Sequence, residues 1–401
     1  MSARSSLRLL LLVLITSPVF LYAAEKPPAY REHQQPDYYL DAEGQERPVK
    51  TIADWKIRRG HILDGIQSVM GRLPGKEKRV PLDMRVIEEE QVGALIRKKI
   101  TYRTEPDDRV AAYLFLPPGD GELCPAVLCL QQTNRKGKLE AAGIDGDPNL
   151  AYALHLARRG YVTLAPDYPG FGESRYDFGP RWGYASGSMK AVWDNIRAVD
   201  LLQSLPQVDP QRIGCIGHSL GGHNAMFTAA FEQRIRVVVS NCGFCRFHKD
   251  DVPSWTGERY MPRISSIYGN DPDRVPFDFP EIVAAFAPRP FLAIAAKRDR
   301  DFDFTGVQDS ISAAEPIYRL YGKADHLEAS YPDTPHAFFP PARKVAYQFL
   351  DKYLRSTKCR RQSKACCSSE TTDLLILVQT NMSVRARVPL VGLFHPVADR
   401  G

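Results

Sequence analysis

Five short apolar runs, most of them separated by helix-compatible segments, constrain the fold of this chain more than any other feature. The runs cover residues 126–130, 161–165, 213–216, 237–240 and 291–295. Apolar runs of this length, without polar alternation, are typical of strands buried on both faces of a parallel sheet. The helix-compatible segments cover residues 150–157, 189–205, 222–231 and 341–354. The alternation predicts an α/β fold with a mostly parallel, doubly wound sheet and helices on both faces.

The first 24 residues have the pattern of an export signal. Arg4 and Arg8 precede an apolar run that gives way to small residues at Ala23 and Ala24. This pattern predicts a signal peptide over residues 1–24 and an exported protein, periplasmic or secreted. A short membrane anchor is the alternative, because cleavage after Ala24 would place Tyr22 at the −3 position, where small residues are usual. No other stretch of the sequence is long enough to cross a bilayer.

The rest of the chain divides into three segments by composition. Residues 25–85 are polar and rich in proline, and we expect an N-terminal extension that wraps the outside of the fold. Residues 86–355 hold the strand and helix pattern and form the main domain. Residues 356–401 have no place in that pattern and predict a poorly ordered tail.

The charge and the cysteines exclude several function classes. The net charge of +6 is carried by the two ends of the chain, so the neutral middle predicts no nucleic-acid partner. Cys242 and Cys245 form a C-x-x-C that follows an apolar strand, whereas a redox site would open a helix. Histidines and acids show no metal-ligand spacing such as H-E-x-x-H. We therefore expect neither a metal nor a cofactor; the oligomeric state is open.

A G-x-S-x-G motif at residues 217–221 carries the chemistry. An apolar strand runs into it and a helix-compatible segment leaves it, which is the strand–turn–helix of a nucleophile elbow. Small residues at Gly217 and Gly221 relieve the crowding of such a tight turn. We predict that Ser219 is a nucleophile exposed at the carboxyl edge of the sheet.

A serine nucleophile needs a histidine base and an acid that precedes it in the chain. His336 lies in a loop between a strand-like run and the last helix, so we predict it as the base. His326 comes before that strand and His395 lies in the tail. Three acids follow the run 291–295: Asp299, Asp301 and Asp303. Asp299 is nearest to the strand end and is the predicted acid, with Asp303 as its main rival.

Two backbone N–H groups must hold the oxyanion of an acyl-transfer reaction. Leu220 follows the nucleophile and supplies the first. Thr133 is the predicted second donor, with Gln132 next, because the polar break 131–133 follows an apolar strand. Aromatic residues crowd the segment between Ser240 and Pro288, and Trp255 and Tyr260 are the predicted substrate-binding residues; packing of a long excursion is the alternative.

Together these residues resemble the α/β-hydrolase superfamily over residues 95–354. The resemblance rests on residues 160–174, on the elbow at 217–222, on residues 288–294 and on Pro335-His336. Within the superfamily the chain looks most like the dienelactone-hydrolase-like and acetyl-xylan-esterase-like enzymes. It has Ser219 where dienelactone hydrolases have cysteine, and Gln131-Gln132 where His-Gly is usual.

The resemblance implies a serine hydrolase, in the first place a carboxylic ester hydrolase that forms an acyl-enzyme on Ser219. Its partner would be a small-molecule or carbohydrate ester. One alternative is a peptidase of the prolyl-oligopeptidase type, although no propeller-like repeat is present in the sequence. The other is a non-catalytic binding protein on a hydrolase scaffold, although all three triad residue types occur in order.

Overall fold

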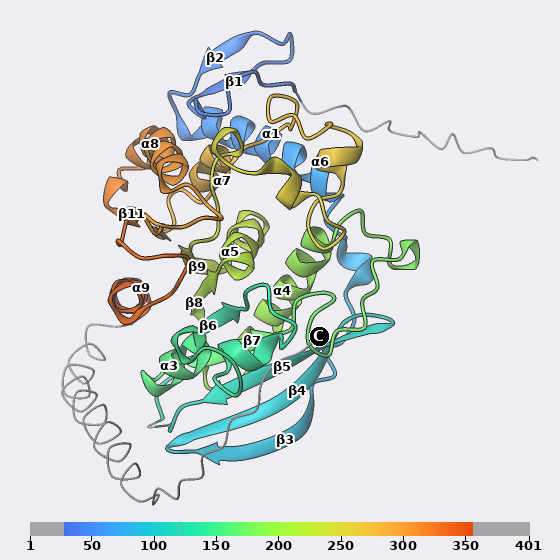
Figure 1. Ribbon diagram of the computed structural model, residues 1–401, viewed down its shortest axis with the longest axis vertical. Helices are drawn as coiled ribbons and strands as arrows, with labels where there is room; N and C mark the ends of the chain where they lie inside the picture. Colours follow the sequence, from blue (N-terminus) through green and yellow to red (C-terminus); the bar gives the residue numbers. More distant parts are fainter. Residues whose placement is uncertain (1–27, 120, 356–401) are drawn as a thin grey trace, which may run out of the picture.

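A nine-stranded sheet forms the centre of the molecule in the computed structural model, which describes residues 28–119 and 121–355 (Figure 1). The strand order is β11-β10-β9-β8-β6-β7-β5-β4-β3. The strands of this sheet are β3 (Arg85–Val92), β4 (Leu95–Glu105), β5 (Asp108–Leu116), β6 (Cys124–Leu130), β7 (Val162–Pro166), β8 (Val208–His218), β9 (Ile235–Asn241), β10 (Phe291–Ile294) and β11 (Leu327–Ser330). The chain order of neighbouring strands reverses around β6, β7 and β8. At such a point an open α/β sheet has a crevice at the carboxyl ends of its strands.

The strands from β7 to β11 are parallel to β6, and β3, β4 and β5 run antiparallel at one side. All five apolar runs seen in the sequence are strands of the parallel part. Their side chains are almost all buried, because helices cover both faces of this part. The predicted α/β fold with a mostly parallel sheet is therefore confirmed.

The helices lie in two layers. Their bounds are α1 (Ile52–Met70), α2 (Lys138–Ala141), α3 (Tyr152–Arg158), α4 (Gly187–Ser204), α5 (Leu220–Phe231), α6 (Arg263–Ser266), α7 (Phe279–Ala285), α8 (Phe304–Leu320) and α9 (Pro340–Leu354). One core cluster joins the sheet to α1, α4, α5, α7 and α8, and a second joins the other face to α3 and α9 (Figure 1). Six short 3-10 helices lie in the connections of the described chain.

The segment before β3, residues 28–84, contributes side chains to the hydrophobic core. Its hairpin of β1 (Tyr38–Leu40) and β2 (Glu46–Pro48) precedes α1, whose start is fixed by a capping box of Thr51 and Asp54. Trp55 and Ile66 of α1 are fully buried in the main core. Residues 25–85 were expected to wrap the outside of the fold, and this helix was not predicted.

Buried ion pairs attach the same segment to α7. Nδ1 of His33 lies 3.0 Å from Oε2 of Glu281, and the guanidinium of Arg58 bonds the other oxygen of that carboxylate. All three side chains are nearly inaccessible to solvent, so the pairing excludes water. No helix within the described residues has the length and apolar character needed to cross a bilayer. The predicted signal peptide and tail lie outside those residues.

Candidate active site

Ser219 stands at the sharp turn between β8 and α5. Its backbone has φ 55° and ψ −122°, a conformation that costs free energy for a residue with a side chain. A Cβ at Gly217 would lie 2.1 Å from the carbonyl oxygen of Gly221, so only glycine fits there. A Cβ at Gly221 would lie 1.9 Å from the carbonyl oxygen of Leu130, which shows how closely α5 begins against the end of β6. The local geometry is that of a nucleophile elbow.

His336 lies in the loop between β11 and α9 and faces Asp299, which follows β10. Its Nδ1 is 2.9 Å and 3.0 Å from the two carboxylate oxygens of Asp299. The Asp299 side chain is 1% exposed, whereas that of Asp301 is 67% exposed and stays 3.7 Å from Nδ1. Asp303 is exposed and caps α8 by accepting the N–H of Thr305. Among the three candidate acids, the structure brings Asp299 against the histidine.

The electrostatic surroundings keep Asp299 charged. Burial disfavours the charge, but the hydrogen bond and charge of His336 outweigh it and lower the pKa of Asp299. The backbone N–H groups of Asp301 and Phe302 also donate to this carboxylate. Because an ionised carboxylate only accepts, the proton of neutral His336 is held on Nδ1. The opposite nitrogen, Nε2, is then left free to accept a proton.

A second histidine, His218, packs beside the first. The two rings lie 4.6 Å apart between centroids, and Phe338 stacks on the His218 ring. Burial and the neighbouring His336 hold the pKa of His218 at about 3, so this ring stays neutral at ordinary pH. His218 directly precedes Ser219, which places the nucleophile turn next to the base. Within the described residues, no hydrogen bond joins Oγ of Ser219 to His336; such bonds are often long before substrate binds.

The predicted oxyanion donors lie on two neighbouring elements. Leu220 is the first residue of α5, where backbone N–H groups have no partner within the helix. Thr133 follows β6 and is exposed, and its Oγ1 lies 3.1 Å from the hydroxyl of Tyr260. The Tyr260 ring also packs against the cluster that contains Leu220. Tyr260 thus lies against both of the residues expected to hold the oxyanion.

Trp255 lies deeper than Tyr260. Its ring is 3% exposed and contacts His223 and Phe279, while its Nε1 donates to Asp250. Tyr260 shares one of these neighbours, because its ring lies 5.8 Å from that of His223. Of the two predicted substrate-binding residues, Tyr260 is the one that is partly exposed beside the elbow, and Trp255 packs beneath the surface.

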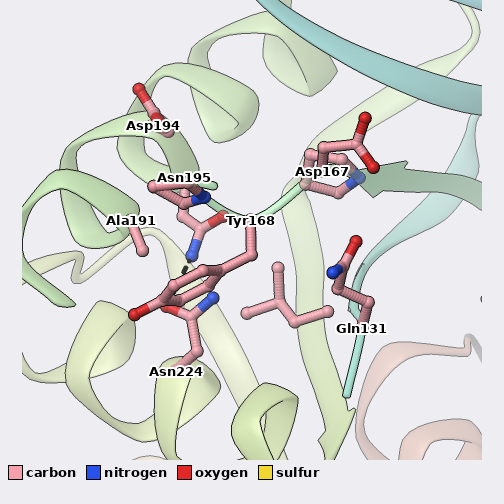
Figure 2. Close-up of a pocket in the computed structure, with 10 residues that line it drawn as sticks. Gln131, Asp167, Tyr168, Ala191, Asp194, Asn195 and Asn224 are labelled. Atoms are coloured by element: carbon pink, nitrogen blue, oxygen red, sulfur yellow. Dashed lines mark hydrogen bonds between the residues drawn. The ribbon is translucent and has the colours of Figure 1, made fainter. Parts of the chain in front are cut away.

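Two hollows adjoin these residues. The first is lined by Gln131, Tyr168 and Asn224 behind the β6 exit and is too narrow to admit a water molecule (Figure 2). It is smaller than the usual 300–1,000 Å3 of a ligand site. The second, of about 360 Å3, opens beside Asp299 and has side chains of both charges, including Lys297 and Asp301. Its lining includes Asp299 but neither Ser219 nor His336.

Sequence reasoning missed two residues at the end of β9. Asn241 donates to His218 and to the loop that carries His336. Cys242 has φ 46°, and its sulfur lies with the ligand atoms of Asp299 and His336 within 4.8 Å of one another. These three could in principle hold a metal, but burial raises the pKa of the Cys242 thiol to about 12, which disfavours the thiolate that metals bind. The polar Asn241 that ends an apolar strand was the signal available in the sequence.

Comparisons with known proteins agree with this fold. The chain is 27% identical over 307 residues to the putative hydrolase YtaP of Bacillus subtilis (strain 168), covering 71% of this chain and 96% of that protein. It is 27% identical over 196 residues to a 4-O-methyl-glucuronoyl methylesterase of Hypocrea jecorina (strain QM6a), covering 43% of this chain and 42% of that enzyme.

A solved structure and a family model complete the comparison. A glucuronoyl esterase from Solibacter usitatus superimposes with a TM-score of 0.65 at 20% identity, covering 81% of this chain and 98% of that one, which shows the shared fold. The expected resemblance to α/β-hydrolases is thereby confirmed. The model of the prolyl oligopeptidase family matches residues 149–357, more than half of the chain. The protein is therefore a hydrolase of the α/β fold and belongs to the prolyl oligopeptidase family.

Proposed function

We propose that this protein is a serine carboxylic ester hydrolase, with Ser219 as nucleophile, His336 as general base and Asp299 as the acid that orients the base. The observation that carries the proposal is the contact of Nδ1 of His336 with both oxygens of the buried Asp299 carboxylate. This pair lies beside a serine in the strained conformation of a nucleophile elbow. The same three roles occur in serine hydrolases of unrelated folds.

The first half of the reaction acylates the enzyme. Nε2 of His336 takes the proton of Ser219 as Oγ bonds to the ester carbonyl carbon, and the carbonyl electron pair moves onto its oxygen. The N–H groups of Leu220 and Thr133 hold that oxyanion. When the oxyanion collapses, the bond to the leaving alcohol breaks, and His336 gives its proton to the departing oxygen. Asp299 stabilises the imidazolium that exists between these two transfers.

The second half of the reaction releases the carboxylic acid product from Ser219. A water molecule gives a proton to Nε2 of His336 while its oxygen bonds to the acyl carbon. The new oxyanion collapses, the bond to Oγ breaks, and His336 returns the proton to Ser219. Every proton that leaves one oxygen is delivered to another, so the cycle needs neither a metal nor a cofactor.

We further propose a carbohydrate ester as the substrate class. A sequence relative and a structural neighbour are both named as esterases of glucuronoyl groups. The tyrosine hydroxyl of Tyr260 beside Thr133, and the polar hollow beside Asp299, are surfaces on which sugar hydroxyls can form hydrogen bonds. Export through the N-terminal leader would bring such an enzyme to extracellular polysaccharide.

A peptidase is the second candidate, because the matched family takes its name from peptidases. Peptidase and esterase activity use the same acyl-enzyme chemistry and differ in the leaving group. Residues 28–119 and 121–355 contain no propeller blade of the kind that would restrict access to the site of such a peptidase. A binding protein without activity is disfavoured, because the contact of His336 with the buried Asp299 carboxylate and the strained backbone of Ser219 both support a catalytic site.

The test is a substrate panel with the Ser219→Ala variant. Purified protein is assayed on a glucuronic acid methyl ester, acetylated xylan, an aryl acetate and a peptide amide. We expect ester hydrolysis by the native protein and a loss of roughly a millionfold in kcat for Ser219→Ala. A fluorophosphonate should label Ser219 of the native protein.

His336→Gln should lose comparable activity, and His326→Gln is its matched control. The His326 ring contacts the Pro288 carbonyl and the Tyr353 ring at the opposite end of β11, so its loss should leave kcat within about twofold. Activity of more than a few per cent in Ser219→Ala would refute the nucleophile. Cleavage of the amide, without the esters, would favour the peptidase.

A further inference from the structure

Asn241 ends β9 and contacts the turn of the nucleophile through its backbone. Its carbonyl oxygen accepts the N–H of Ser219 at 2.9 Å. Gly222 is also pressed against this strand end, since a Cβ there would lie 3.2 Å from the same carbonyl oxygen. The main chain of Asn241 therefore holds one end of the elbow, whatever its side chain does.

The Asn241 side chain contacts a different segment, the loop that carries His336. Its Nδ2 donates to the carbonyl oxygen of Ala337 at 3.2 Å and lies 2.6 Å from Nδ1 of His218. A carbonyl oxygen can only accept, so the amide nitrogen must face it, and its second hydrogen points to Nδ1 of the neutral His218. Both contacts connect Asn241 to His336. Ala337 is the next residue in the chain after His336, and the His218 ring packs against the His336 ring.

The amide is costly where it lies. Asn241 is fully buried, and its Oδ1 has no hydrogen-bond partner among the described residues. An apolar side chain would avoid burying this unsatisfied oxygen, so stability alone does not explain an amide at this position. Unsatisfied or strained groups of this kind concentrate at functional sites.

We propose that Asn241 is a positioning residue that fixes the distance between the nucleophile turn and the histidine loop. This proposal rests on the proposed function, because it assigns Ser219 and His336 as the partners that must meet. Asn241 touches neither substrate nor the reacting atoms. It acts by holding the Ser219 backbone with its carbonyl and the His336 loop with its amide, so the serine and the base approach each other from fixed supports.

The experiment compares Asn241→Ala with Asn195→Ala on the ester that the native protein cleaves best. Asn195 is a matched control, because it is also buried and its amide also has two partners, Asn224 and Thr228, in the contact of α4 with α5. Circular dichroism and thermal unfolding show that each variant is folded. We expect Asn241→Ala to lower kcat roughly 10- to 100-fold with KM within about twofold, since a misplaced reacting group costs rate more than binding. Asn195→Ala should keep kcat within about twofold.

Asn241→Asp keeps the size of the side chain and serves where the alanine variant does not fold. Its carboxylate cannot donate to the Ala337 carbonyl, so kcat should fall by a similar factor at neutral pH. Burial raises the pKa of a carboxyl at such a position, and the neutral form regains one O–H donor. The ratio of the variant's kcat to the native kcat should therefore rise as the pH is lowered.

A substrate-free measurement separates this proposal from the proposed function. The proton on Nδ1 of His336 is detected by proton NMR as a low-field resonance that His336→Gln abolishes. Asn241→Ala should broaden or shift it, and Asn195→Ala should not. A folded Asn241→Ala with native kcat, or with an unchanged resonance, would overturn the positioning role. Equal losses in both asparagine variants would do the same, because they would indicate a general effect on packing. Absence of ester hydrolysis by the native protein would count against the proposed function alone.

Discussion

The clearest prediction concerns the acid that orients His336, since three aspartates compete within five residues. Replacing each in turn by asparagine removes one negative charge and keeps the size of the side chain. Asp299→Asn replaces a carboxylate whose two oxygens lie 2.9 Å and 3.0 Å from Nδ1. The new amide can present its N–H to Nδ1, which would move the histidine proton to Nε2 and leave no base facing Ser219.

The expected magnitudes differ widely among the three variants. Loss of the correct tautomer lowers kcat by about ten-thousandfold, or about 5.4 kcal/mol of activation free energy. Asp301 is 67% exposed and 3.7 Å from Nδ1, so its attraction to the imidazolium is about 1 kcal/mol in a water-like dielectric. Asp301→Asn should therefore cost at most about fivefold. Asp303→Asn should cost little, because asparagine is also a good N-cap for α8.

The assay is kcat at saturating ester for the native protein and the three variants, with circular dichroism to show that each is folded. A large loss in Asp299→Asn alone would support the assignment. A large loss in Asp303→Asn or Asp301→Asn, with Asp299→Asn near native activity, would refute it. In that case the loop after β10 would have to rearrange when substrate binds.

Two further predictions concern stability. Burial alone would lower the pKa of His33, but the charge and hydrogen bond of Glu281 raise it above its ordinary value. Protonated His33 therefore stabilises the folded protein at pH values below the unfolded pKa, which is near 6.5. This contribution is lost as the pH rises through the folded pKa. The difference in Tm between the native protein and His33→Gln should therefore be largest in mild acid and shrink at higher pH; a difference that grows with pH would contradict the pairing. Trp255→Ala should lower the free energy of unfolding by about 3–5 kcal/mol because the ring is 3% exposed, with Trp255→Phe losing less in a denaturant titration. Because the sequence predicted that Trp255 binds substrate, Trp255→Ala should also raise KM, and an unchanged KM in folded protein would refute that pocket role.

Much of the fold could be predicted from the sequence because its signals are local. Apolar runs of four or five residues indicated every parallel strand from β6 to β10, since a strand buried on both faces needs no polar alternation. The helix α1 was missed for an equally local reason. Arg58 and Gly65 occupy buried positions of its apolar face, so the helical period is interrupted in the sequence. The carboxylate of Glu281, more than 200 residues away, pairs with the buried charge of Arg58, and the Tyr30 ring packs against the same guanidinium.

The candidate site also combines features that the local sequence determines with features that depend on tertiary contacts. The G-x-S-x-G motif determined the turn around Ser219 by itself, because glycines at positions 217 and 221 are required by contacts within that turn and with the strand beside it. The choice of Asp299 over Asp303 was left to the tertiary structure. It depends on where the loop after β10 meets a loop 37 residues further along the chain. The positioning role that we propose for Asn241 also depends on tertiary contacts, because its amide reaches His218 and the Ala337 carbonyl only where β8, β9 and the histidine loop meet.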